Sequence, residues 1–116
     1  MSQPALRPVM SVRIYREEKC FGPGVAELLE RVRETRSLRR AALDMEMSYS
    51  KAWNIVKNAE SGLGLKLLSS SVGGAGGGGA DLTPEAEKLL ADYRAFESEC
   101  HDFVADAFSR HFSAYG

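Results

Sequence analysis

Residues 48–60 carry the side chains whose chemistry is most distinctive in this sequence. On a helix that turns about 100° per residue, one face of this stretch is wholly polar. That face holds Ser50, Lys51, Asn54, Lys57 and Asn58. The other face holds Ala52, Val56 and Ala59, with Tyr49 and Ile55 beside them. Lysine can donate to phosphates or guanine, asparagine can pair with adenine through two hydrogen bonds, and serine can donate or accept. The polar face therefore suits the major groove of DNA, although a solvated surface helix would show the same pattern.

A shorter helix is predicted directly before this one. Ser37 is a favoured N-cap, and the residues after it keep an apolar side to about Asp44. Residues 45–47 then make a tight connection, and Ser48 can cap the helix that carries the polar face. Two short helices joined by about three or four residues form a helix-turn-helix.

The helix-turn-helix arrangement assigns roles to particular side chains. The N-terminal residues of the second helix approach base edges, while the first helix crosses the DNA backbone. Base-side contacts are therefore expected from Ser48, Tyr49, Ser50, Lys51 and Asn54. Arg39 and Arg40 would hold phosphates, which fix the register on DNA without specifying its sequence. Ser37 and Lys57 complete the predicted set on these two helices.

The flanking residues predict the other parts of a mainly α fold with a small β component. Residues 9–21 alternate apolar and polar side chains before a charged turn, which is typical of a β-hairpin. Residues 25–35 have one apolar stripe, so residues 25–60 would contain three helices. Residues 65–82 are predicted as a β-wing, with six glycines among residues 73–79. Backbone amides at the tip of this wing would lie close to DNA at Gly76, Gly77 and Gly78.

A long C-terminal helix is predicted over residues 83–112. Thr83 is a favoured N-cap and Pro84 suits the first helical position. Such a helix would measure about 40 Å, whereas a domain of this size is about 25–30 Å across. Its apolar residues follow a heptad seam with a flanking ridge, and the part that the domain cannot cover predicts a homodimer. The predicted dimer interface consists of Leu89, Tyr93, Phe96, Cys100, Phe103, Val104, Ala107 and Phe108.

The composition is that of an ordinary globular protein, and a single domain over residues 1–116 is expected. The net charge of −1 hides an asymmetry, because residues 1–72 hold 12 basic and 8 acidic side chains, and residues 73–116 hold 3 and 8. A basic front suits a protein that meets a polyanion with one side. The sequence has no apolar run of about 18 residues and no secretory signal, and its two cysteines have no paired spacing. A cytoplasmic protein without membrane contact is expected.

Other classes of function have less support from the residues. The glycine run lacks the lysine and the Ser/Thr of a phosphate-binding loop. Cys100 and His101 lie far from His111, which is not a metal-ligand spacing, and no nucleophile–base set indicates an enzyme. No catalytic residue, metal or cofactor is therefore predicted. One alternative of another class stays open: a protein-interaction module that uses the winged-helix surface without binding DNA.

The segment Ser37–Trp53, SLRRAALDMEMSYSKAW, closely resembles the helix-turn-helix of the ModE family of molybdate-responsive transcription regulators. The resemblance extends over about residues 9–100 and includes GGAGGGGADLT at Gly73–Thr83 and LLADYRAFE at Leu89–Glu97. It implies a winged helix-turn-helix related to LysR-type DNA-binding domains, with helix 48–60 in the major groove and the wing on the backbone or minor groove. It also implies dimerisation through the N-terminal hairpin and the long helix, and a double-stranded DNA site of two-fold or pseudo-palindromic character.

Two departures from the family's pattern shape the expected function. Glu46 stands in the turn where the family often has glycine, so a positive φ there would cost up to about 1–2 kcal/mol unless the turn is rearranged. Full regulators of the family carry C-terminal oxyanion-binding domains, whereas this sequence ends at Gly116. The expectation is a sequence-specific DNA-binding transcriptional regulator of the ModE type without that domain, and molybdate is not expected to bind this chain.

Overall fold

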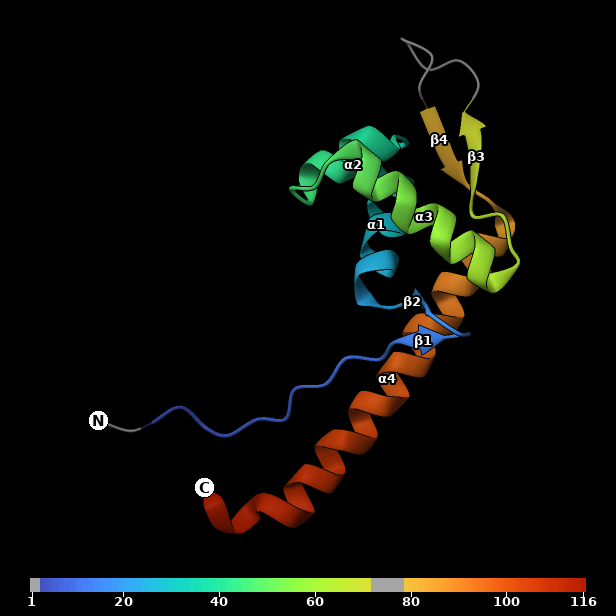
Figure 1. Cartoon of the computed structure of the whole chain (residues 1–116). Coiled ribbons are helices and arrows are strands. Elements are labelled where there is room, and N and C mark those ends of the chain that lie inside the picture. The colour runs from blue at the N-terminus through green and yellow to red at the C-terminus, as the bar shows by residue number, and fades with distance from the viewer. Residues whose placement is uncertain (1–2, 72–78) are drawn as a thin grey trace.

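Three helices and a two-stranded wing form the body of the molecule (Figure 1). The computed structural model describes residues 3–71 and 79–116. In chain order the elements are β1 (Ile14–Tyr15), β2 (Lys19–Phe21), α1 (Pro23–Thr35), α2 (Leu38–Asp44), α3 (Tyr49–Leu63), β3 (Leu68–Ser71), β4 (Gly79–Leu82), α4 (Pro84–Phe112) and the short 3-10 helix η1 (Ser113–Tyr115). This is the mainly helical winged helix-turn-helix that the sequence predicts. None of the described helices is both long and apolar enough to cross a membrane.

The helix-turn-helix begins at the N-caps that the sequence indicates. The Oγ of Ser37 accepts a hydrogen bond from the N–H of Arg40 at 3.0 Å, and the Oγ of Ser48 accepts from the N–H of Lys51 at 3.1 Å. Each cap satisfies a backbone donor that the first helical turn leaves without a partner. The two caps thereby fix where α2 and α3 start, and they set the length of the connection between them.

The core consists of two apolar clusters that share α1. One lies between α1, α2 and α3 and contains Leu28, Val32, Leu38, Ala41, Ala42, Ala52 and Val56. The other joins α1 and α3 to β2 and the start of α4, and contains Phe21, Val25, Ala26, Leu29, Ala59, Leu67, Ala86, Leu90 and Tyr93. Because both clusters hold the inner stripe of α3, the opposite face of this helix is turned to solvent.

Tyr93 anchors α4 to the body of the molecule. Its ring meets Phe21 edge to face with the ring centroids 4.9 Å apart, and its hydroxyl donates to the carbonyl oxygen of Val12 at 2.8 Å. Burial, together with the carboxylate of Glu97, raises the pKa of Tyr93. The sequence analysis assigned Tyr93 to the dimer seam, but the structure places it in the chain's own core, where it is 2% exposed.

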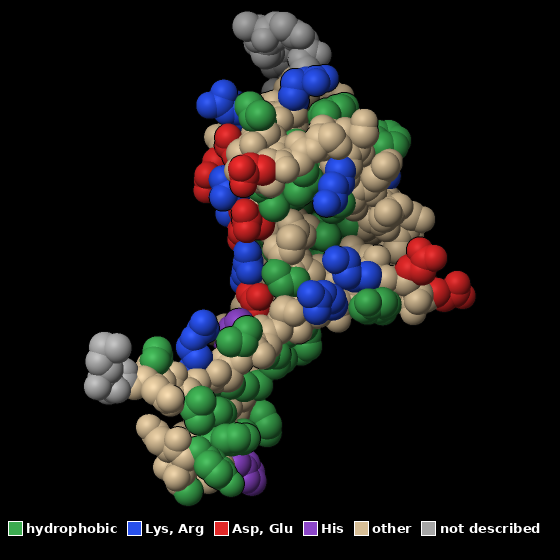
Figure 2. Space-filling view, turned by 60° about the vertical axis from the view of Figure 1, so that its left-hand side comes forward, with side chains coloured by type: hydrophobic (Ala, Val, Ile, Leu, Met, Phe, Trp, Pro, Cys, Tyr) green, Lys and Arg blue, Asp and Glu red, His purple; other side chains and the backbone are tan. Residues whose placement is uncertain are grey.

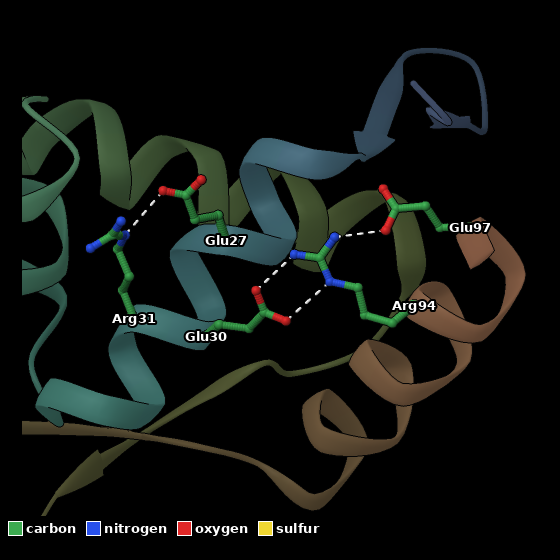
Figure 3. Close-up of polar contacts among 5 residues, drawn as sticks. All are labelled: Glu27, Glu30, Arg31, Arg94 and Glu97. Atoms are coloured by element: carbon green, nitrogen blue, oxygen red, sulfur yellow. Dashed lines mark hydrogen bonds and ion pairs between the residues drawn. The ribbon is translucent and has the colours of Figure 1, made fainter. Parts of the chain in front are cut away.

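An ion-pair network provides a second link between α1 and α4 (Figure 3). Arg94 donates to both carboxylate oxygens of Glu30, at 3.1 and 2.7 Å, and to Glu97 at 2.8 Å. These hydrogen bonds from Arg94 lower the pKa of Glu30, and the same contacts raise the pKa of Arg94. A bidentate pair of this kind fixes the orientation of the two helices as well as attracting them.

The N-terminal hairpin is shorter than predicted. The sequence analysis placed a hairpin at residues 9–21, but paired strands occur only at Ile14–Tyr15 and Lys19–Phe21. The return strand cannot extend further because Gly22 is followed by Pro23 at the first turn of α1. Among the described residues, those before Ile14 therefore pair with no strand, and their alternating pattern forms no ladder.

The C-terminal end of α3 also differs from the prediction. The helix was expected to stop near Glu60, but it continues through Leu63 and ends at Gly64, whose φ is 70°. Gly62 is accommodated because it lies against β2, where a Cβ added to it would come within 2.5 Å of the Cβ of Cys20. The glycine thus permits close packing of α3 on β2 rather than breaking the helix.

The C-terminal helix gives the molecule an elongated shape (Figure 1). The extents are 58 × 35 × 22 Å and the radius of gyration is 17.7 Å, against about 13 Å for a compact chain of this length. Within α4 the buried residues are Ala86, Leu90 and Tyr93, all in its first third. The remaining two thirds of α4 extend away from the three-helix body.

Candidate nucleic-acid interface

The turn between α2 and α3 is tight and contains a residue in the left-handed region. Glu46 has a φ of 57°, and its N–H donates to the carbonyl of Leu43 at 3.0 Å. The N–H of Met47 donates to the carbonyl of Ala42 at 3.0 Å, which closes the turn. The structure thus keeps the positive φ that glycine would favour, and a Cβ at this position carries a cost of about 1–2 kcal/mol.

The polar face of α3 is turned away from the core. Ser50, Lys51, Asn54 and Asn58 are exposed, while Ala52, Val56 and Ala59 are buried. Short side chains on the inner face let α3 approach α1 and α2 closely. The N-terminal half of α3 therefore presents a serine, a lysine and an asparagine on an open surface, the combination that can hydrogen-bond to base edges.

Two aromatic residues of α3, Tyr49 and Trp53, are 41% and 45% exposed. The sequence analysis placed Tyr49 beside the core face and also among the base-side contacts, and it assigned Trp53 no role in the site. Trp53 leaves the buried stripe because it follows Ala52 by one residue, about 100° around the helix. Each ring carries a cation: the guanidinium of Arg39 lies 4.5 Å from the Tyr49 centroid, and the Nζ of Lys57 lies 5.3 Å from that of Trp53.

The predicted phosphate-binding arginines lie on the exposed side of α2. The Nε of Arg40 is 3.6 Å from the Oδ1 of Asp44, one turn along the same helix. Such an exposed pair contributes little and is easily exchanged for a phosphate. Arg39 makes the cation–π contact with Tyr49 described above, so this arginine lies beside the N-terminal end of α3.

The wing is fastened to the helices at its base. β3 and β4 pair antiparallel, with Leu68 opposite Leu82. Arg36, between α1 and α2, donates to Asp81 at 2.9 and 3.2 Å, and its carbonyl accepts from the N–H of Ala80 at 3.0 Å. The predicted contacts at Gly76, Gly77 and Gly78 lie outside the described residues.

Glu60 joins α3 to the first strand of the wing. Its Oε2 accepts from the N–H of Leu67 at 2.8 Å and of Leu68 at 3.4 Å, and its Oε1 lies 3.2 Å from the Nζ of Lys57. Burial alone would raise the pKa of Glu60, but the hydrogen bond from Leu67 and the contact with Lys57 outweigh it and lower the pKa. The carboxylate therefore stays charged and fixes the spacing between α3 and β3.

A groove of about 290 Å³ lies in that space, and we call it the α3–β3 groove. Its polar and aromatic lining includes Arg39, Tyr49, Trp53, Lys57, Lys66 and Ser69. Sequence reasoning missed Lys66, because a single lysine before a strand carries no periodic signal. No group of metal-ligating side chains occurs among the described residues, and both cysteines there are free thiols.

The helix-turn-helix and the wing both match a known protein family. Residues 25–87 match the family described as "bacterial regulatory helix-turn-helix protein, lysR family". This stretch is more than half of the chain and runs from α1 through the first turn of α4. The chain belongs to this family. The description of this family names a regulatory protein that carries a helix-turn-helix.

Within this family, the similar proteins that are known by name include regulators of the ModE type. The chain is 39% identical over 71 residues to the molybdenum-pterin-binding protein MopB of Rhodobacter capsulatus, covering 61% of this chain and 26% of that protein. It is 36% identical over 77 residues to the molybdenum transport protein ModE of Herbaspirillum seropedicae, covering 66% of this chain and 29% of that protein. It is 33% identical over 75 residues to the transcriptional regulator ModE of Haemophilus influenzae, covering 65% and 29%. The chain thus spans less than a third of the length of these relatives, and the resemblance to ModE-type regulators is confirmed for the matched region.

Most of α4 in this regulator lies beyond the residues that match the family. Phe96 and Phe103 are 50% and 70% exposed. Cys100, Val104, Ala107 and Phe108 are half-buried, as is Leu89 nearer the body. The ring of Phe112 stacks on Phe108 with the centroids 4.9 Å apart. The structure thus leaves an apolar strip on α4 without cover from the three-helix body.

Proposed function

We propose that this regulator binds specific double-stranded DNA sequences with α3 in the major groove and the β3–β4 wing on the adjacent backbone or minor groove. The observation that carries this proposal is the exposed polar face at the N-terminal half of α3, in a chain of a helix-turn-helix family. A side chain reaches a base edge only if it is both free of the core and able to form directed hydrogen bonds. Ser50, Lys51 and Asn54 meet both conditions.

The surrounding residues have positioning roles in this proposal. Arg39 and Arg40 would hold phosphates on the α2 side, because both guanidiniums are exposed. Ser37 and Ser48 would act mainly through their caps, which aim the starts of the two helices. The molybdenum in the relatives' names concerns proteins of which this chain covers less than a third, so the proposal stops at DNA.

We propose that the regulator works as a homodimer through α4. The lower limb in Figure 2, formed by the projecting part of α4, shows hydrophobic side chains gathered along its length. An apolar strip of this kind is typical of an interaction surface. Two-fold pairing is the commonest way for identical chains to cover such a strip. A two-fold dimer would present two α3 helices to sites about 34 Å apart, which corresponds to a pseudo-palindromic operator.

Selection of genomic fragments by the purified protein tests the DNA proposal. Enrichment of a common sequence is expected, with weaker binding by Lys51→Ala and Arg40→Ala. Each of these variants should lower the slope of log affinity against log salt by about one unit if the cation contacts a phosphate. Lys88→Ala is the matched control, because Lys88 is an exposed cation on α4. Absence of any enrichment at low salt would contradict the proposal.

A further inference from the structure

The α3–β3 groove has the chemistry of a site for a purely accepting, negatively charged ligand. Among its described lining residues three are basic and none is acidic. Arginine, lysine and tryptophan side chains can donate hydrogen bonds but cannot accept them. Serine and tyrosine hydroxyls can donate as well. The polar part of the lining therefore favours a ligand that offers acceptor oxygens.

The cations in the groove are held in place before any ligand arrives. Lys57 lies over the indole of Trp53, and Arg39 lies over the ring of Tyr49. The carboxylate beside Lys57 belongs to Glu60, which also accepts from the N–H groups of Leu67 and Leu68. The carboxylate of Glu60 therefore interacts with backbone N–H groups as well as with Lys57. An anionic ligand can still approach the ammonium of Lys57.

Lys66 lies at the other wall of the groove on a fixed stretch of backbone. Its carbonyl oxygen accepts from the hydroxyl of Thr83 at 2.6 Å, which ties it to the start of α4. The Nζ of Lys66 makes no ion pair within the described part of the chain. The groove therefore has, near β3, an ammonium without an ion pair among the described residues, whereas Lys57 lines the groove from α3.

The aromatic side chains of the groove have unused donors. Over residues 3–71 and 79–116, neither the indole N–H of Trp53 nor the hydroxyl of Tyr49 makes a hydrogen bond. An aromatic ring that stays about half exposed on the helix nearest the DNA, with its donor unpaired, is available for a contact that the free protein does not make.

We propose that the α3–β3 groove holds one phosphodiester backbone of the bound DNA, with Tyr49 and Trp53 as direct phosphate donors and with Lys57 and Lys66 as its cations. This inference rests on the proposed function, since it assigns a role to residues beside the polar face of α3. It moves Tyr49 from the base side, where the sequence analysis placed it, to the backbone. It also adds Trp53 and Lys66, which the sequence analysis did not include.

Trp53 makes the inference directly observable, because the chain contains one tryptophan. A DNA duplex recovered by the fragment selection is labelled, and its fluorescence anisotropy reports binding. Intrinsic fluorescence of Trp53 is followed in the same titration. The expected result is a change in tryptophan emission that saturates at the DNA concentration that saturates the anisotropy signal.

Variants separate the aromatic donors from the cations. Tyr49→Phe removes only a hydroxyl, and Trp53→Phe removes the indole donor together with part of the ring under Lys57. Each should weaken binding about three- to tenfold while leaving the salt slope unchanged. Lys66→Ala should weaken binding and lower the salt slope by about one unit. Tyr15→Phe is the matched control, because Tyr15 is an exposed tyrosine on β1 outside the groove.

The experiment distinguishes failure of the groove assignment from failure of the proposed DNA binding. Wild-type affinity of both aromatic variants, with Trp53 emission unchanged at saturating DNA, overturns the groove assignment and leaves DNA binding by α3 intact. Absence of any anisotropy change with the wild-type protein overturns the proposed function and the groove assignment together. Circular dichroism verifies that each variant is folded, and Tyr49→Phe decides the matter alone if a tryptophan variant does not fold.

Discussion

Two single residues of this regulator, Glu46 and Gly62, lie in positions that restrict which side chain is tolerated. Glu46 holds a left-handed conformation in the helix-turn-helix turn, and Gly62 holds a close contact between α3 and Cys20. Glu46 has a side chain although its φ favours glycine, whereas Gly62 has no room for a side chain beside Cys20. Substitutions at these two positions should therefore change stability in opposite directions.

Glu46→Gly is expected to stabilise the protein. The φ of 57° penalises a Cβ, so glycine should relieve strain, although its greater freedom in the unfolded chain offsets part of the gain. Glu46→Ala removes the same charge and keeps the Cβ, which makes it the matched control. Glu46→Gly should exceed Glu46→Ala by about 1 kcal/mol in the free energy of unfolding, measured by urea denaturation. Equal stability of the two variants would show that the turn is not strained.

Gly62→Ala is expected to destabilise the protein by about 1–2 kcal/mol, even though alanine is the better helix former. The added Cβ would lie 2.5 Å from the Cβ of Cys20, so α3 and β2 must separate. Gly24→Ala is the control, because a Cβ at that helical position meets nothing within 4 Å. Thermal unfolding should show a lower midpoint for Gly62→Ala only. A rise in its midpoint would mean that helix propensity outweighs the contact.

At the scale of elements, the sequence predicts best the features that depend on local interactions. The start of α2 follows from the cap at Ser37, and its end at Asp44 follows from the loss of the apolar pattern. The hairpin was overextended because a strand requires a partner strand, and local alternation contains no information about one. The exposure of Trp53 could not be predicted from the sequence, because a helical wheel shows direction but not how far neighbouring elements extend over the helix.

The link between α1 and α4 predicts how stability depends on pH. Hydrogen bonds from Arg94 lower the pKa of Glu30 in the folded state, so the carboxylate stabilises the fold above its unfolded pKa of about 4.3. That contribution is lost as pH falls through the lowered folded-state pKa. Glu30→Gln should therefore reduce the free energy of unfolding by about 0.5–1 kcal/mol at pH 7, since the pair is partly exposed to solvent.

The difference between wild type and Glu30→Gln should shrink as pH falls below about 4.3, and it should disappear once pH is below the lowered folded-state pKa of Glu30. Glu27→Gln is the control, because Glu27 pairs with Arg31 within α1 and does not join two elements (Figure 3). Urea denaturation at several pH values measures both variants. A pH-independent loss in Glu30→Gln would show that packing, rather than the charge on Glu30, holds α4.

At the scale of the whole molecule, the 58 Å length of the chain is the feature that a single copy does not explain. An unsupported helix with exposed phenylalanines is costly in water, because apolar surface is stabilised by burial. A partner copy against α4 would remove that cost and would set the distance between the two DNA-binding faces. In the proposed dimer the interface and the DNA site would therefore be linked, and weakening the interface should weaken DNA binding.

Phe103→Glu tests this link. Phe103 is 70% exposed, so the fold of each chain should survive, while a charge in the proposed interface should shift the protein to monomers in light scattering. Affinity for a pseudo-palindromic duplex should fall at least about tenfold, whereas affinity for a single half-site should stay unchanged. Ser98→Glu is the matched control, because Ser98 is exposed about 140° around α4 from Phe103. The proposal that α4 forms the dimer interface would be contradicted by a wild-type protein that is monomeric at micromolar concentration. A Phe103→Glu variant that stays dimeric would contradict it as well.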